Sequence, residues 1–382
     1  MILLTGADGY LGWPAFLKLG KAFPEEQIIG VDNFSRRQWV DTVGSVSAIP
    51  VETMEKRMEA VKRLGLHHLH FIEGDLADQD FVYQLLQQFK PDTIIHLAAQ
   101  PSAPYSHING KTAAFTQENN NSMLRNLLWG MHEIGLEDTH LIVTTTTGVY
   151  GTPEFTIPEG FLTLQGDNGL ERIPYPGMAT SWYHMSRAND INNLYVAHHL
   201  WKLPITDIRT SIIFGTDTEE TKQDEALANR FDFDFYFGVV PNRFCAQALA
   251  NVPITIYGKG EQKKPMIPLE DAVISIVNAV KLNKAKAFEV FNQASLLVSP
   301  VDLGQAVQKA CSDRGLSVQL SHIPNPRVEK EEHQMKMELS GFSKQLLKKE
   351  PQSLQETIDQ TIKTLAPYKE TIKNYQHAML NH

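Results

Sequence analysis

The chain has little cysteine, no dense basic stretch and no long apolar run. Its two cysteines among 382 residues, Cys245 and Cys311, lie far apart and make no Cys-x-x-Cys pair. A disulfide framework is therefore not expected, and two packing thiols suit a reducing compartment. The formal net charge is -9, and lysine and arginine form no dense cluster. Neither nucleic acid nor an anionic membrane surface is an expected partner.

No apolar run is long enough to cross a bilayer, and no signal-peptide core precedes the apolar residues that begin at Ile2. We therefore expect a cytoplasmic location and no membrane contact. His333 stands beside Glu331 and Glu332, but no second ligand group has the spacing of a metal site, so no metal is expected. With 42% hydrophobic and 21% charged residues, the composition is that of a globular chain.

Short apolar runs alternate with helical patterns in the first half of the chain. The expected strands are residues 2–5, 27–31, 69–72, 93–97, 140–145 and 205–213. This rhythm predicts an α/β fold, a Rossmann-type doubly wound parallel sheet with a smaller C-terminal substrate-binding lobe. We expect a dinucleotide-binding domain over 1–215, its sheet completed by later segments, a mainly substrate-binding lobe over 216–340 and a helical tail over 341–382. Residues 33–50 form a long connection, and 51–64 are expected to be an inserted helix near the cofactor.

Glycines spaced three apart follow the first apolar run, at Gly6, Gly9 and Gly12. Glycine there permits a sharp turn, removes a Cβ that would clash with a pyrophosphate and directs the amides of the next helix at the phosphates. Asp32 follows about 20 residues later, where a carboxylate bonds the ribose hydroxyls and repels a 2'-phosphate, so NAD is favoured over NADP. Arg36 and Arg37 leave two alternatives, a solvated pair or a role near the adenine or phosphates.

A second cluster carries reactive side chains. Tyr183 and Arg187 lie four residues apart in a helical stretch and therefore share a face. Thr146 lies in a threonine-rich run at the carboxyl end of the fifth expected strand, the edge of an open α/β sheet where ligands bind. A hydroxyl, a phenol and a cation are expected to meet there.

These motifs resemble the extended short-chain dehydrogenase/reductase family of NAD-dependent nucleotide-sugar epimerases and dehydratases. The glycine loop, the turn at 74–76, the segment 96–100, the pair 119–120 and the tyrosine helix follow the family's order. The UDP-sulfoquinovose synthase branch is the most similar one. Its motifs are matched at 102–106, 116–120, 149–153, 242–245, 257–260, 291–293 and 324–333.

The resemblance implies roles for residues that match the family's motifs. The catalytic residues would be Tyr183 as the base on the sugar 4-hydroxyl, Thr146 as its hydrogen-bonding partner, and Arg187. The NAD-binding residues would be Gly6, Gly9, Tyr10, Leu11, Gly12, Asp32, Asn33, Arg36, Asp75, Leu76, Leu97, Ala98, Ala99, Gln100, Asn120, Tyr183 and Arg187. The substrate-binding residues would be Ser102, Thr146, Ser181, His184, Asn242, Arg243, Tyr257, Gln262, Lys264, Arg327 and His333. Arg243 and Arg327 are candidates for the diphosphate and uridine end, with surface ion pairs as the alternative.

Arg187 departs from the family, which has lysine at that position. Lowering a phenol's pKa from about 10 to about 7 requires roughly 4 kcal/mol. One cation at about 5 Å in an effective dielectric of about 20 supplies around 3 kcal/mol, and oxidised nicotinamide adds positive charge. Charge alone therefore does not exclude catalysis, but a planar, forked guanidinium is not a larger lysine. We expect slower or altered chemistry.

The resemblance implies a UDP-hexose substrate oxidised at C4, dehydrated across C5 and C6, attacked by sulfite at C6 and reduced again at C4. Two departures from the family's pattern weaken the expectation of a sulfite step. Pro101 stands where plant-type synthases have an arginine, and residues 147–149 differ from the family's pattern. The alternatives are a UDP-sugar 4-epimerase or dehydratase, and a catalytically quiet NAD or nucleotide-sugar binding protein. Family analogy also implies a homodimer formed by helices near 112–132 and 183–199.

Overall fold

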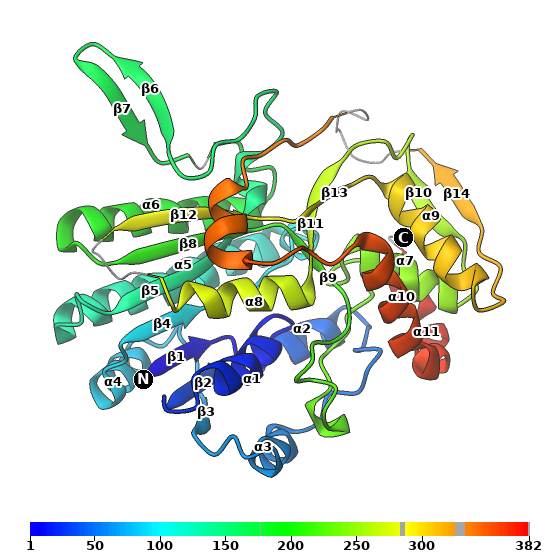
Figure 1. The fold of residues 1–382 in the computed structure, drawn as a ribbon, viewed down its shortest axis with the longest axis horizontal. Helices are drawn as coiled ribbons and strands as arrows, with labels where there is room; N and C mark the ends of the chain where they lie inside the picture. Colours follow the sequence, from blue (N-terminus) through cyan, green and yellow to red (C-terminus); the bar gives the residue numbers. More distant parts are fainter. Residues whose placement is uncertain (176, 283–286, 325–332, 381–382) are drawn as a thin grey trace.

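The computed structural model describes residues 1–175, 177–282, 287–324 and 333–380. Its centre is a seven-stranded sheet with the order β12-β8-β5-β4-β1-β2-β3, in which every neighbouring pair is parallel (Figure 1). The expected Rossmann-type α/β fold is confirmed. The strands are β1 (Ile2–Thr5), β2 (Ile28–Asp32), β3 (Leu69–Glu73), β4 (Thr93–His96), β5 (His140–Thr146), β8 (Ile205–Thr210) and β12 (Phe288–Gln293).

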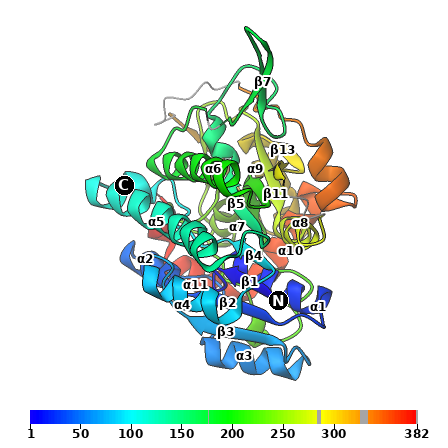
Figure 2. The same cartoon turned by 90° about the vertical axis from the view of Figure 1, so that its left-hand side faces the viewer.

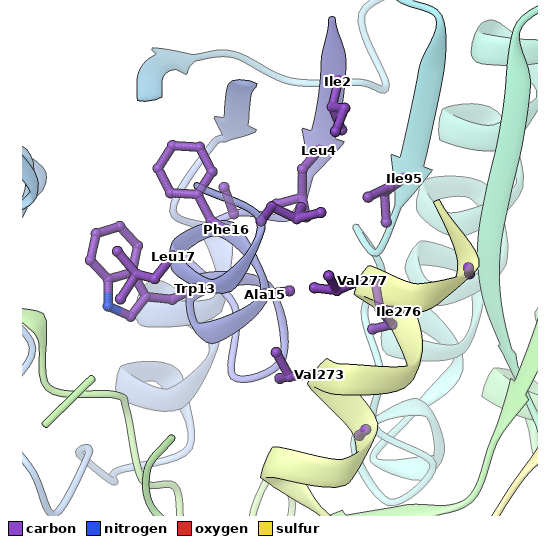
Figure 3. Packing of buried hydrophobic residues seen from close by; sticks show 14 of the residues in the cluster. Ile2, Leu4, Trp13, Ala15, Phe16, Leu17, Ile95, Val273, Ile276 and Val277 are labelled. Atoms are coloured by element: carbon purple, nitrogen blue, oxygen red, sulfur yellow. The ribbon is translucent and has the colours of Figure 1, made fainter. Parts of the chain in front are cut away.

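Helices cover both faces of the sheet (Figures 1 and 2). On one face, α1 (Gly12–Ala22) packs against α8 (Leu269–Ala279), and on the other α4 (Gln79–Phe89), α5 (Gly110–Ile134) and α6 (Trp182–Trp201) lie side by side. Figure 3 shows the first interface, where α1 and α8 meet beneath β1 and β4. Its fully or nearly fully buried side chains include Leu4, Trp13, Phe16, Leu17, Ile95, Val273, Ile276 and Val277.

Local sequence signals set the ends of the two helices that carry the candidate site. Asn109 caps α5 through a capping box with Thr112, and Gly135 ends the helix with a φ of 77°, a conformation that favours glycine. Ser181 caps α6 by accepting a hydrogen bond from the His184 amide. These signals place Tyr183 in the first turn of α6.

Segments of the C-terminal half form a smaller lobe with its own core. Helices α7 (Val240–Leu249), α9 (Pro300–Ser312), α10 (Leu354–Leu365) and α11 (Lys369–Asn374) surround the pair β10 (Ile254–Tyr257) and β14 (Leu320–Ile323). A three-stranded sheet of β9 (Ile212–Phe214), β11 (Lys264–Pro268) and β13 (Leu296–Val298) lies between the lobe and the large sheet (Figure 1). In the tail, Ile358, Ile362 and Leu365 share one face of α10 and are fully buried. A hairpin of β6 (Leu162–Gly166) and β7 (Gly169–Ile173) projects from the body (Figure 1).

The insertion after β2 contains two helices, α2 (Ser35–Thr42) and α3 (Met54–Arg63). The expectation of helix over 51–64 is confirmed by α3, whereas α2 was not expected. The insertion contacts the chain that follows β9: Arg57 donates to the Ala228 carbonyl at 2.8 Å, and the Ala48 amide donates to the Phe231 carbonyl at 2.9 Å. In the described ranges, no helix combines the length and apolarity that a membrane crossing requires.

Candidate active site

The glycine loop lies where the carboxyl ends of β1 and β4 meet. Gly6 has a φ of 79°, and a Cβ there would lie 2.7 Å from the Ala98 backbone nitrogen. A Cβ on Gly12 would lie 1.8 Å from the Gly6 carbonyl oxygen. The sequence argument assigned the absence of these side chains to a pyrophosphate, but the packing of the loop on its own backbone already requires it. The glycine loop therefore lies against the backbone at the end of the sheet with no room for side chains at Gly6 and Gly12, and we call this arrangement the glycine cradle.

Asp32 ends β2 beside this loop and accepts hydrogen bonds from the backbone amides of Asp8 at 2.9 Å and Phe34 at 2.7 Å. Burial, with the nearby Asp8 carboxylate, raises the pKa of Asp32 to about 6. At neutral pH the side chain is therefore mainly a carboxylate, as recognition of ribose hydroxyls requires. Asn33, Asp75 and Leu76, also predicted here, lie on the connections after β2 and β3.

Arg36 and Arg37 both form ion pairs inside the protein. Arg36 donates to Asp232 at 2.7 Å and Arg37 donates to Asp8 at 2.7 Å. Asp8 also receives Arg57 at 2.7 Å, and both side chains of that pair are buried. A solvated arginine pair, one of the two alternatives, is therefore wrong for these residues. Both guanidinium groups are therefore engaged by carboxylates of the protein, each of which also pairs with a second arginine.

The three expected catalytic residues occupy β5 and α6. Thr146 is the last residue of β5, and its hydroxyl accepts the Gly148 amide at 3.1 Å. Tyr183 is half-buried in the first turn of α6, and its amide donates to Ser106 Oγ at 3.2 Å. Burial raises the pKa of the Tyr183 phenol, which Arg187 opposes only in part and Asp190 increases. Arg187 therefore lowers this pKa, as expected, but in the protein without cofactor burial outweighs the one cation and the net shift is upward.

Arg187 is buried and ion-paired. Its Nη1 donates to Asp190 Oδ2 at 2.7 Å, and its Nη2 donates to the Thr144 carbonyl. Its Nε has no hydrogen-bond partner in the part of the chain that the structure describes. A buried donor without a partner is rare in proteins and fits a ligand hydroxyl.

A buried amide network lies beside the tyrosine helix. The Gln100 amide donates to Asn120 Oδ1 at 2.7 Å, and Asn120 Nδ2 donates to Ser186 Oγ at 3.0 Å. Gln100 and Asn120 were expected to touch the cofactor, and both side chains are engaged within the protein. Ser102, expected to touch the substrate, accepts the Tyr105 amide at 3.0 Å and donates to the Tyr236 carbonyl. These hydrogen bonds therefore fix the positions of Gln100, Ser102 and Asn120 relative to α6.

Three of the residues predicted to bind substrate have buried polar atoms without a hydrogen-bond partner among the described residues. These atoms are His184 Nδ1, Gln262 Oε1 and His333 Nε2. Lys264 acts on His184, which burial and this charge keep neutral by lowering its pKa to about 4. The His333 carbonyl accepts a hydrogen bond from the Lys263 amide at 3.0 Å. Gln262 and Lys264 are the sequence neighbours of Lys263, so His333 lies close to both. A ligand rich in hydroxyl and phosphate groups would satisfy such atoms.

Other predicted substrate residues lie on α7 and β10. Asn242 is buried, accepts the Gly215 amide at 3.0 Å and lies 3.4 Å from the Tyr10 hydroxyl. Arg243 is buried with its guanidinium 5.6 Å from the Phe235 ring centre. Tyr257 ends β10. Arg327 lies outside the described residues.

Sequence reasoning missed three residues that hold the catalytic helix: Ser106, Asn121 and Asp190. Ser106 and Asn121 lie in a short helix (Tyr105–His107) and in α5, so their contacts with α6 could not be seen without the fold. Asp190 lies three residues after Arg187, a spacing that places both on one helix face. That spacing was a usable signal.

The described residues fit NAD. The glycine cradle, the paired Asp32 and the unused Nε of Arg187 lie along the carboxyl edge of the sheet, where dinucleotides bind in doubly wound folds. Hydroxyl acceptors of a nicotinamide ribose would satisfy a donor such as Nε.

Comparison with known proteins agrees with this fold. UDP-sulfoquinovose synthase from Spinacia oleracea is 38% identical over 87% of this chain and 68% of that protein. UDP-sulfoquinovose synthase from Sulfolobus acidocaldarius is 36% identical over 99% of this chain and 96% of that protein. The crystal structure of UDP-glucose 4-epimerase from Bifidobacterium longum with NAD+ and UDP has a TM-score of 0.72 at 17% identity, covering 96% of this chain and 99% of that one. The family model that matches residues 2–294 is described as the NAD dependent epimerase/dehydratase family. The chain is a member of the NAD-dependent epimerase/dehydratase family.

Proposed function

We propose that this chain is an NAD-dependent enzyme that modifies a UDP-hexose through a 4-keto intermediate, most like UDP-sulfoquinovose synthase. The observation that carries the proposal is the position of Arg187, which donates to the Thr144 carbonyl of β5, two residues before Thr146, and acts on the Tyr183 phenol. Buried polar atoms without partners among the described residues, at His184, Gln262 and His333, support a ligand site. Identity of 36–38% with the two synthases supports the branch.

The chain's own residues supply binding and proton transfer. Tyr183 accepts the proton of the sugar 4-hydroxyl, and Thr146 orients that hydroxyl at the end of β5. NAD held by the glycine loop and Asp32 would supply the acceptor for the hydride from the sugar C4 and the donor for its later return. Arg187 adds positive charge beside the phenol and favours its ionised form. His184, kept neutral by burial, offers an uncharged ring nitrogen to the hexose.

We propose that the 4-ketone then allows loss of water across C5 and C6, and that sulfite adds at C6 before C4 is reduced. The ketone acidifies the C5 proton and conjugates the new double bond, which makes the sugar an acceptor for a nucleophile. A UDP-sugar 4-epimerase or dehydratase is the alternative on the same residues, and Pro101 favours it. Plant-type synthases have an arginine at this exposed position.

Incubation with UDP-glucose, with and without sulfite, followed by mass spectrometry tests the proposal. A product in which a sulfonate replaces a hydroxyl supports the synthase. An isomer or a product lacking one water supports the alternative. An unchanged sugar that only protects the protein against unfolding would contradict enzyme function and leave a binding protein.

We also propose a homodimer built on α5 and α6, which lie together on the side shown in Figure 2. Their exposed large apolar side chains include Trp129 at 46%, Trp182 at 52%, Val196 at 51% and Leu200 at 62% exposure. Patches of this kind on a globular chain mark interaction sites.

The same proposal includes a cytoplasmic location. It also includes the division of the chain into a domain over 1–215, a lobe over 216–340 and a tail. Two buried, unpaired cysteines support that location.

A further inference from the structure

Arg187 is held from two sides, and this has a consequence for the chemistry at Tyr183. Nη1 pairs with Asp190 at 2.7 Å, and the two side chains are only 2% and 0% exposed. Nη2 donates to the Thr144 carbonyl at the end of β5. Of the three guanidinium nitrogens of Arg187, only Nε has no hydrogen-bond partner among the described residues. Two of the three nitrogens of the fork are therefore engaged inside the protein.

Asp190 is itself held by the neighbouring helix. Asn121 of α5 donates through Nδ2 to Asp190 Oδ1 at 2.9 Å and to the Ser186 carbonyl at 2.8 Å. Burial raises the pKa of Asp190 to about 6, against the effects of Arg187 and Asn121. Asn121 thus fixes the Asp190 carboxylate from the neighbouring helix and, together with Arg187, opposes the rise in its pKa that burial causes.

Charged groups from every neighbouring element face this pair. Tyr183 on α6 is affected by both Arg187 and Asp190, with opposite signs. His96 on β4 is affected by Arg187, and burial keeps it neutral. Asp207 on β8 acts on Asp190, but it is paired with Arg209 at 2.9 Å. The phenol of Tyr183 therefore faces an ion pair instead of a lone cation.

We propose that Asp190, supported by Asn121, is a positioning residue that holds the Arg187 guanidinium beside Tyr183 and balances its charge. The inference rests on the proposed function for the identity of the base. It explains how an arginine works where the family has lysine: Asp190 and the Thr144 carbonyl engage the two terminal nitrogens, which leaves Nε as the donor for a ligand. Of the forked cation, one N–H is thereby left without a partner among the described residues.

The test is ultraviolet titration of the phenol in the protein without nucleotide, using the tyrosinate absorbance. The chain has 11 tyrosines, so the Tyr183 signal is the difference between each protein and its Tyr183→Phe counterpart. Asp190→Asn keeps the size of the side chain and removes the balancing charge. We expect the Tyr183 midpoint to fall by about one pH unit. Asn121→Ala leaves Asp190 charged at the pH where the phenol titrates and Arg187 paired, but it removes the hydrogen bond that fixes the Asp190 carboxylate. A less fixed carboxylate balances the charge of Arg187 less well, so we expect a smaller shift of the midpoint in the same direction.

Asn192→Ala, which changes an exposed asparagine of α6, is the matched control and is expected to leave the midpoint unchanged. An unchanged or raised midpoint in both Asp190→Asn and Asn121→Ala would overturn the inference. Should Asp190→Asn fail to fold, Asn121→Ala alone decides it. Turnover of UDP-glucose, measured separately, tests the proposed function. A shifted Tyr183 midpoint without turnover of UDP-glucose contradicts only the proposed enzyme function. Turnover of UDP-glucose with an unchanged Tyr183 midpoint in the variants contradicts only the positioning role of Asp190.

Discussion

The Tyr10 hydroxyl donates a hydrogen bond of 2.6 Å to the Gly215 carbonyl, although the two residues are 205 positions apart in the chain. Tyr10 belongs to the glycine loop, and Gly215 follows β9, where the chain enters the smaller lobe. Burial raises the pKa of this phenol, so it remains a neutral donor. The bond therefore joins the candidate cofactor loop to the candidate substrate lobe.

Removal of this hydroxyl should loosen the junction of the two parts. Tyr10→Phe loses the bond to Gly215 and leaves a buried carbonyl without this donor, which costs about 1–2 kcal/mol in the free energy of unfolding. Urea denaturation followed by circular dichroism measures the change. Tyr195→Phe, on an exposed part of α6, is the control and should have the stability of the unmodified protein. Equal stability of Tyr10→Phe and the control would show that the bond contributes nothing.

Cofactor preference should follow the charge on Asp32. Its carboxylate repels a 2'-phosphate, and Arg36 and Arg37 are paired with Asp232 and Asp8. We expect NADH to bind at least about tenfold more tightly than NADPH at pH 8. The pKa of Asp32 is raised to about 6, so below that pH the carboxyl is neutral and the preference should narrow at pH 5.

Fluorescence titration with both reduced cofactors measures this ratio. Asp32→Ser should narrow the ratio at pH 8, whereas Asp41→Ser, which changes an exposed acid of the same insertion, should not. A ratio independent of both pH and Asp32 would mean that another group selects the cofactor.

Acid should destabilise the fold through His96. This ring is buried and shares a hydrogen bond with Thr5 Oγ1 at 2.9 Å, and burial lowers its pKa from 6.5 to about 3. Below pH 6.5 this histidine binds a proton in the unfolded chain but not in the folded protein. The stability of the folded protein that is present above pH 6.5 is therefore lost as the pH falls towards 3. The contribution is at most about 5 kcal/mol.

His96→Asn should flatten the dependence of unfolding free energy on pH between these limits, measured by urea denaturation at a series of pH values. His67→Asn, at an exposed position, serves as the control and should keep the slope of the unmodified protein. Parallel slopes for His96→Asn and the control would refute this role of burial.

The proposed dimer should depend on the apolar face of α6. Leu200→Glu places a charge on a side chain that is 62% exposed, and we expect it to produce monomers in sedimentation velocity. Leu316→Glu changes a leucine that is 44% exposed beyond α9 and should leave the oligomeric state unaltered. Monomers in the unmodified protein would contradict the proposed interface.

Strands were easier to predict than the contacts that build the site. β1 and β5 are buried on both faces and are nearly all apolar or β-branched, so each could be recognised from its own residues. By contrast, α2 is polar and begins after Phe34, which has a positive φ of 58°, so no apolar periodicity revealed it. The pair of Arg36 with Asp232 joins positions 196 residues apart. No local pattern encodes such a contact, because folding alone brings its members together.

The central claim is that the Tyr183 phenol, with Arg187 beside it, takes the proton of a UDP-hexose hydroxyl as NAD is reduced. Stopped-flow absorbance of reduced nicotinamide after mixing NAD-loaded protein with UDP-glucose tests it most directly. We expect reduction in the unmodified protein and a rate lower by about 10²–10⁴ in Tyr183→Phe, with NAD still bound. Equal rates in the two proteins, or no reduction in the unmodified one, would contradict the account.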